Sequence, residues 1–279
     1  MSELDQADSP KKVPSWAREP FTSFMRDLNR AVNFYYLTKD GLSATAGEAQ
    51  RLDELSAELR RLNEVCRQRV PPEVRHLWDD EENPEADDPI REASRNATVE
   101  VDEGFPTLHR QVALSLWSSL EWLISNLLAN LLANEPKTFN IEGVRKVKVS
   151  VAELENLSGM EKYYYLLSEV ERDAKSGLRQ GVDRFESTLQ VFGLSGSVPE
   201  TIKKDLFEFG HVRNVLVHRN GVADARFVQA CPWLGLSAGQ AAIVDEARLS
   251  QYIHAILEYV KLLCDRLVAH FMDLWGKNT

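Results

Sequence analysis

The stretch "FEFGHVRNVLVHRNGVAD" at residues 207–224 has the pattern of a helix that ends at an Asn-Gly pair. Apolar residues at helical spacing lead into it and continue through it: Ile202, Leu206, Phe209, Val212 and Leu216. This stripe predicts a helix over residues 199–218 that faces the core of an α-helical protein.

Polar side chains interrupt the stripe near its end. Arg213 falls inside the apolar face, whereas Asn214 and His218 lie one turn apart on the opposite side, together with His211. An unpaired guanidinium is costly to bury, so Arg213 needs either a carboxylate of a neighbouring helix or the phosphate of a ligand. Arg213 and His218 diverge by about 140° on an ideal helix. Either the helix loosens before the Asn-Gly pair, or a second copy of the helix completes the site.

Helical periodicity extends over most of the remaining chain, which predicts an all-α fold class with an N-terminal helical extension. We expect further helices at residues 20–38, 47–69, 105–134, 152–176, 178–193 and 245–274. Only residues 141–151 alternate like a strand, and they suit a loop equally well.

Proline and charge indicate the domain organisation. Residues 1–19 are expected to form a flexible arm and residues 20–78 a helical extension. The segment "PPEVRHLWDDEENPEADDP" carries four prolines, and seven acidic residues fall between positions 79 and 88, so residues 79–95 are expected to be an acidic linker. A mimic of nucleic acid is the alternative interpretation of that segment. Residues 96–279 then form the main domain.

The chain has 279 residues, of which 43% are hydrophobic and 27% are charged, as is ordinary for a soluble globular protein. The net charge of −10 is uneven: residues 1–104 hold 23 acidic and 14 basic side chains, and the remainder hold 20 and 19. This balance argues against a broad basic face for duplex DNA but leaves room for single-stranded nucleic acid at a local pocket.

Cysteine and histidine spacing argues against a metal site. The three cysteines lie far apart, which disfavours both a disulfide framework and a zinc site. His211 and His218 share a helix face, but no third ligand stands at suitable spacing. We therefore expect no metal and no cofactor.

Two features bear on location. The N-terminal "MSELDQADSPKKVPSW" lacks an apolar signal core, which predicts a cytoplasmic protein. The apolar segment 113–133 includes Glu121, Asn126 and Asn130, which a spanning helix would normally avoid. We expect a buried core helix there and no membrane insertion. Its apolar face is predicted to consist of Leu116, Leu120, Leu123, Leu127 and Leu131, and a second contact face of mostly small and polar residues to consist of Ser115, Ser118, Trp122, Ser125 and Ala129.

The "VRNVLVH" segment resembles the R-N-x-x-x-H signature of HEPN domains (higher eukaryotes and prokaryotes nucleotide-binding). "WSSLEWLISNLL" (117–128) is similar to the first long helix of that family, and "LSQYIHAILEYVKLLCDRL" to its closing helix. "VPETIKKDLFEFGHVRNVLVHRNGVADARFVQACP" resembles its motif helix and the short helix that follows. The resemblance covers roughly residues 107–273 and makes residues 96–279 a HEPN-like helical bundle.

The resemblance implies a metal-independent endoribonuclease that acts as a homodimer on RNA. His218 would be the general base or acid, Arg213 would hold the scissile phosphate, and Asn214 would orient the histidine or bind the phosphate. The ribose 2′-hydroxyl would be the nucleophile. Two neighbours, His211 and Arg219, are further candidates for RNA contacts.

The resemblance also implies a biological setting and leaves alternatives. Such domains in bacteria are commonly toxins or antiviral effectors, so we expect an inhibitory partner or antitoxin. A catalytically silent nucleotide- or partner-binding module is the second hypothesis. A helical scaffold with Arg213 in a buried ion pair is the third.

Overall fold

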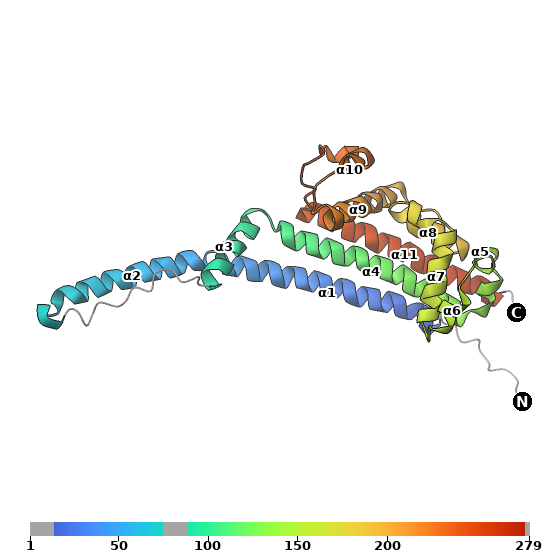
Figure 1. Cartoon of the computed structure of the whole chain (residues 1–279), viewed down its shortest axis with the longest axis horizontal. Coiled ribbons are helices and arrows are strands. Elements are labelled where there is room, and N and C mark those ends of the chain that lie inside the picture. Colours follow the sequence, from blue (N-terminus) through green and yellow to red (C-terminus); the bar gives the residue numbers. More distant parts are fainter. Residues whose placement is uncertain (1–13, 75–88, 277–279) are drawn as a thin grey trace, which may run out of the picture. The chain divides into compact units, whose positions relative to one another are not determined.

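The computed structural model describes residues 14–74 and 89–276, and these residues form an all-α fold (Figure 1). Within the described residues the only β contact is an isolated bridge between Val222 and Ala241. The predicted all-α class is confirmed. The α-helices are α1 (Ser15–Thr45), α2 (Glu48–Arg69), α3 (Pro89–Asp102), α4 (Pro106–Asn134), α5 (Glu142–Arg145), α6 (Val151–Glu155), α7 (Glu161–Asp173), α8 (Val182–Val191), α9 (Glu200–His218), α10 (Ala225–Ala230) and α11 (Glu246–Gly276). Short 3-10 turns are η2 (Pro136–Asn140), η3 (Ser176–Leu178) and η4 (Pro232–Leu234).

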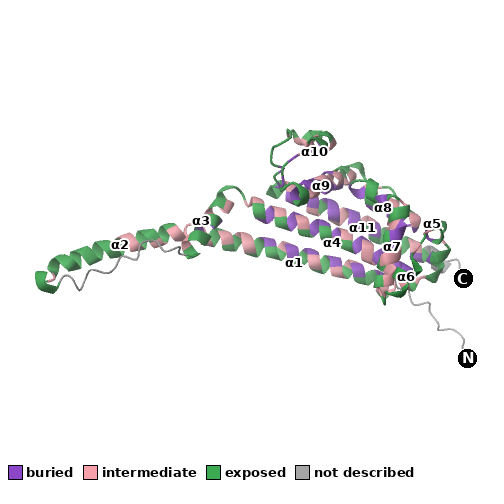
Figure 2. Ribbon diagram, viewed as in Figure 1, coloured by how far each residue is buried: buried purple, intermediate pink, exposed green. Residues whose placement is uncertain are grey.

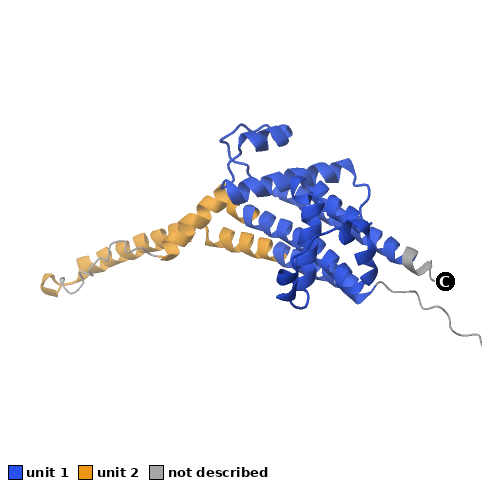
Figure 3. Ribbon diagram, turned by 45° about the vertical axis from the view of Figure 1, so that its right-hand side comes forward, with its two compact units in different colours: residues 1–32, 110–279 blue, residues 33–109 orange. Residues whose placement is uncertain are grey.

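The chain forms two compact units (Figure 3). Of the described residues, 14–32 and 110–276 make up the first unit, and 33–74 and 89–109 make up the second. The boundaries therefore fall inside α1 and α4, not at the expected linker 79–95. Helix α3 occupies the end of that linker from Pro89 onward, and residues 75–88 lie outside the described residues.

Helix α1 begins earlier than the prolines suggested. It starts at Ser15, inside the expected arm 1–19, and it carries Pro20 in its interior. Trp16 packs edge-to-face on Phe271 of α11, with ring centroids 5.5 Å apart, and Ala17 is fully buried. This apolar packing favours a helix through Pro20 despite the missing N–H donor. Residues 1–13 of the expected arm lie outside the described residues.

The core of the first unit is built around α4. Its predicted apolar face is buried at every position: Leu116, Leu120, Leu123, Leu127 and Leu131. Solvent exposure differs along the predicted second face: Ser115, Ser118 and Trp122 are exposed, whereas Ala129 is buried. By length and composition α4 is the one described helix that could cross a membrane, and 56% of its most apolar window is buried in the protein.

Helices α8 and α9 approach each other closely because a glycine stands at their crossing. Gly181 precedes α8 with φ of 56°, and a Cβ built there would lie 2.5 Å from the Cα of Phe207. The expected helix break around residue 177 is present, but it is longer than predicted, from α7 to α8. The expected helix 152–176 is also divided into α6 and α7, since Gly159 adopts φ of 53° between them.

Two carboxylates with little solvent access, the part-buried Glu186 and the buried Glu208, link α8 and α9 to α11. Glu186 of α8 accepts hydrogen bonds from the Tyr259 hydroxyl (2.8 Å) and from Nη1 of Arg266 (2.7 Å). Glu208 of α9 accepts from the Tyr252 hydroxyl (2.9 Å) and from Nε1 of Trp233 (2.5 Å). Each carboxylate thus has several partners, as buried charges require.

The second unit holds α2 and α3 together through its own contacts. The backbone N–H of Ala49 donates to the Ser94 hydroxyl (2.8 Å), and Arg91 pairs with Asp53 (3.1 Å). Beyond this contact α2 is exposed over most of its length, and none of its residues is buried (Figure 2).

Candidate active site

The motif residues stand on the last two turns of α9, which ends at His218 as predicted. The helix stops because Asn220 and Gly221 take positive φ values of 50° and 80°. The N–H of Gly221 donates to the carbonyl of Val215 (2.9 Å). Since α9 remains α-helical through His218, it does not loosen to bring Arg213 and His218 onto one side.

An arginine of α4 fixes this helix end from outside. Nη2 of Arg110 donates to the carbonyl of Leu216 (2.6 Å), and Nη1 donates to Oδ1 of Asn220 (2.8 Å). A cation at a helix C-terminus is favoured by the helix dipole and satisfies a carbonyl that has no partner within the helix. Arg110 therefore holds in place the turn that carries His218.

Arg213 lies at the margin of the core. Its side chain is 27% exposed, and Nη2 lies 3.7 Å from a carboxylate oxygen of Glu121 on α4. Nη1 also donates a long hydrogen bond of 3.4 Å to Oδ1 of Asn214. In this structure the partner of Arg213 is thus a carboxylate of a neighbouring helix, the first of the two expected alternatives.

Glu121 is shared between two guanidinium groups. Arg184 of α8 donates to its other oxygen at 2.8 Å, a shorter contact than that of Arg213. A second carboxyl group, that of Glu171, lies near the same residues, so two guanidinium groups share their surroundings with two carboxyl groups. Burial raises the pKa of the nearby Glu171 carboxyl, whereas Arg184 lowers it and Glu121 raises it.

His218 and Asn214 retain unused hydrogen-bonding groups. The His218 side chain is exposed and makes no hydrogen bond or ion pair with the part of the chain that the structure describes. Asn214 is partly exposed, and its amide oxygen receives only the long bond from Arg213. Both side chains are therefore available to a ligand that approaches the end of α9.

The two additional candidates have different surroundings. His211 packs on Phe207, with ring centroids 4.5 Å apart, and its Nε2 is buried without a hydrogen-bond partner among the described residues. Burial lowers the pKa of His211, and Asp224 opposes that shift. Arg219 is exposed, and its Nε lies 3.8 Å from Asp224. An RNA contact by either residue stays a prediction, and Arg219 is the more accessible of the two.

The end of α9 carries three kinds of polar side chain. Among the side chains that the structure describes, no group of three or more His, Cys, Asp or Glu residues is arranged to hold a metal ion. What the end of α9 offers is an imidazole, an amide and a guanidinium. These groups can transfer a proton and stabilise negative charge on an oxyanion.

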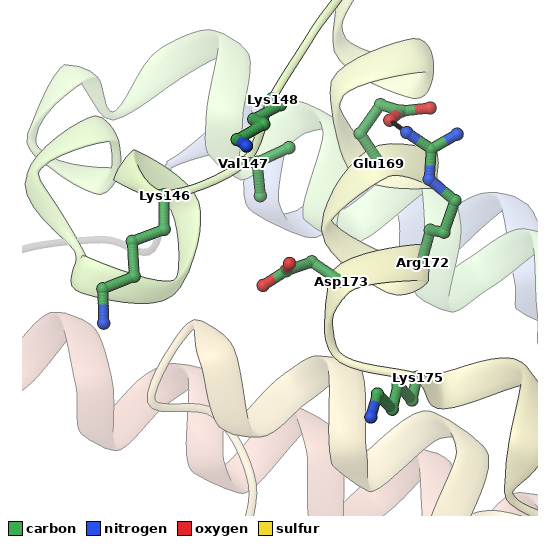
Figure 4. Close-up of a pocket in the computed structure, with 7 residues that line it drawn as sticks. All are labelled: Lys146, Val147, Lys148, Glu169, Arg172, Asp173 and Lys175. Atoms are coloured by element: carbon green, nitrogen blue, oxygen red, sulfur yellow. Dashed lines mark hydrogen bonds and ion pairs between the residues drawn. The ribbon is translucent and has the colours of Figure 1, made fainter.

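A separate hollow of about 380 Å³ lies between the loop at residues 146–148 and the end of α7 (Figure 4). Its lining is mostly charged: Lys146, Val147, Lys148, Glu169, Arg172, Asp173 and Lys175. Lys146 is paired with Glu142 and Arg172 with Glu169, so Lys148 and Lys175 supply the unpaired positive charge among the described residues. No motif residue lines this hollow.

Comparison of the chain with protein-family models, with curated proteins and with solved structures found no match.

Three residues that shape the site were not predicted as part of it: Arg110, Glu121 and Arg184. Arg110 is 106 positions from Leu216, and Arg184 is 63 positions from Glu121, so no local pattern links them. One signal was present, because Glu121 is the single charged residue in the apolar segment 113–133. A carboxylate in such a segment indicates a cationic partner in the folded protein.

Proposed function

We propose that this protein is a metal-independent endoribonuclease of the HEPN type that acts as a homodimer. The observation that carries the proposal is the composition of the end of α9. One rigid helix presents Arg213, Asn214 and an unpaired, exposed His218, and Arg110 fixes its last turn. A scaffold function would require none of these side chains to remain accessible.

The proposed reaction uses a nucleophile that RNA already carries. The 2′-hydroxyl oxygen attacks the adjacent phosphorus, a P–O2′ bond forms, and the P–O5′ bond breaks. His218 of one copy accepts the 2′ proton, and His218 of the second copy gives a proton to the leaving 5′ oxygen. Arg213 and Asn214 bind the non-bridging oxygens, where negative charge increases. The products are a 2′,3′-cyclic phosphate and a 5′-hydroxyl.

Geometry favours two copies for this reaction. The attacking and leaving oxygens lie on opposite sides of phosphorus, so base and acid must approach from opposite sides. A single regular α9 supplies one histidine, which points away from its own Arg213. We propose that the two copies meet through the exposed face of α4, which carries Ser115, Ser118 and Trp122. Trp122 is 41% exposed in the single chain.

Cleavage of an end-labelled RNA in excess EDTA tests the proposal. We expect a 2′,3′-cyclic phosphate on the upstream product, and we expect His218→Ala to abolish cleavage while His254→Ala, at an exposed histidine of α11, does not. The mechanism is contradicted if EDTA abolishes cleavage and magnesium restores it, or if the downstream product carries a 5′-phosphate.

Subunit mixing tests the shared site separately. In this experiment the unchanged protein and the His218→Ala variant are mixed and exchange subunits. A site that needs both histidines is active only in dimers of two unchanged copies, so total cleavage activity is proportional to the square of the fraction of unchanged subunits. A fall in simple proportion to that fraction shows that each copy acts alone.

A catalytically silent module that binds an anionic ligand is the second candidate. Two observations favour it: Arg213 already has a carboxylate partner, and the hollow at Lys148 and Lys175 is cationic. Under this candidate, Lys148→Glu with Lys175→Glu weakens binding of a single-stranded oligonucleotide that carries 2′-deoxyribose, measured by fluorescence anisotropy. Lys137→Glu with Lys261→Glu, at exposed sites outside the hollow, is the control.

We further propose, from the family resemblance alone, a cytoplasmic toxin or antiviral effector that an inhibitory partner restrains. Growth arrest on expression, abolished by His218→Ala, is the expected outcome. Unimpaired growth at high expression of an enzyme that is active in vitro contradicts the toxin role.

A further inference from the structure

Helix α2 has an apolar face that no described residue covers. Leu55, Leu59 and Leu62 are 57%, 57% and 54% exposed, and no residue of the helix is buried. Figure 2 shows exposed positions along almost the whole of α2 beyond its contact with α3. Exposed leucines scattered singly are ordinary, but a continuous row indicates a contact surface.

The row follows the spacing of a coiled coil. Alternating steps of three and four residues relate its members: Leu52, Leu55, Leu59, Leu62 and Cys66. This is the a/d pattern of a heptad repeat, which places every member on one seam of the helix. Such a seam packs its side chains into the holes of a second helix with the same pattern.

The charges on α2 select the direction of that second helix. Residues 48–58 carry four acidic side chains and one basic side chain, whereas residues 60–69 carry four basic and one acidic. The two halves thus have balances of −3 and +3. A parallel pair would set like halves side by side, whereas an antiparallel pair sets each acidic half beside a basic half.

We propose that α2 associates with α2 of a second copy of this chain as an antiparallel coiled coil. In this arrangement Leu59 lies level with Leu62 of the second copy, and Leu55 lies level with Cys66 of the second copy. The exposed leucines are then buried on both chains. The surface is distinct from the proposed catalytic site and does not depend on Arg213 or His218.

Disulfide trapping tests both the contact and its direction. In a Cys264→Ser background, which removes the other exposed thiol, Leu55→Cys places a thiol opposite Cys66 of the second copy. Mild oxidation of the full-length protein is expected to give a covalent dimer on non-reducing gels. Cys264→Ser alone, and Cys264→Ser with Leu55→Cys and Cys66→Ser, are expected to stay monomeric on the same gels.

The same gels define the contrary results. Dimers in both control variants indicate a parallel pair, because like positions then face each other, and overturn the antiparallel arrangement. No dimer in any variant shows that α2 does not pair with itself, so that another segment or another protein covers its seam. Neither result bears on RNA cleavage, so this proposal fails separately from the proposed function.

Sedimentation equilibrium supplies a test without new cysteines, made in a Trp122→Glu background so that the proposed α4 contact does not hold the copies together. In that background Leu59→Glu with Leu62→Glu puts charges into the seam and is expected to lower the weight-average mass of the full-length protein by about half. Gln50→Glu with Gln68→Glu adds the same two charges at exposed positions off the seam and is expected to leave the mass unchanged. Equal masses for both double variants contradict pairing through α2.

Discussion

Replacing Arg213 by methionine separates a ligand-binding role of the guanidinium from a role in stability. The Arg213–Glu121 contact is 3.7 Å long, and its two side chains are 27% and 24% exposed. Ion pairs with this much solvent access contribute about 0.2–1 kcal/mol. Methionine retains the apolar stem, so we expect the free energy of unfolding to fall by no more than about 1 kcal/mol.

The same change is expected to remove most catalysis. If Arg213 stabilises charge on the phosphate in the transition state, its loss lowers kcat by about 10²–10³-fold. The melting temperature falls by only about 2–4 °C, as a loss of 1 kcal/mol implies for a domain of this size. Urea unfolding and single-turnover RNA cleavage measure the two effects on one preparation.

Arg184→Met is the matched control. It removes the other guanidinium bound to Glu121, at the shorter distance of 2.8 Å, and Arg184 is 44% exposed and lies outside the motif. We expect a similar small loss of stability and a far smaller loss of kcat, because Arg184 reaches the motif only through Glu121. A loss above about 3 kcal/mol in Arg213→Met, the size typical of a broken buried ion pair, refutes this reasoning and makes Arg213 a structural residue.

Three further predictions concern the surroundings of the motif. Arg110→Met removes the two hydrogen bonds that cap α9, so the free energy of unfolding should fall by about 1.5–3 kcal/mol, with faster amide exchange at residues 216–221. Gly181→Ala forces a Cβ to within 2.5 Å of the Phe207 backbone at a positive φ and should cost about 2–5 kcal/mol in urea unfolding, whereas Gly177→Ala meets open space and should cost little. Burial lowers the pKa of His211 from 6.5, so below that pH the unfolded chain binds more protons and stability falls as the pH falls. In His211→Leu the free energy of unfolding should decrease less between pH about 7 and about 5. If its dependence on pH is the same as in the unchanged protein, His211 is not the cause of the loss.

Helix periodicity predicted those parts of the fold that local sequence controls. The five leucines of the α4 face are all buried, and the predicted helix 199–218 corresponds to α9 at Glu200–His218. Both ends of α9 have local causes, since Pro199 precedes it and the Asn-Gly pair follows it. The expected helix 152–176 was wrong because periodicity continues across a turn that a single glycine conformation creates.

The surroundings of the site depend on tertiary contacts, which periodicity does not encode. The sequence indicated that Arg213 needed a partner but gave no means to choose between a carboxylate and a phosphate. The choice of Glu121 follows from the packing of α4 on α9, and Arg184 reaches the same carboxylate from α8. The cap by Arg110 is likewise visible only after α4 and α9 are placed side by side.

A comparison of Arg213 with a buried charge on the same helix supports the proposal that the motif binds a ligand. Glu208 is only 5% exposed, and it is held by Tyr252, Trp233 and Arg248. In the same first unit Arg213 has one long ion pair and one long hydrogen bond. Glu208 is thus fully hydrogen-bonded, whereas Arg213, about one turn further along α9, is only weakly bound. Weak internal contacts cost little to exchange for a phosphate, whereas a fully partnered guanidinium would have to lose strong bonds first.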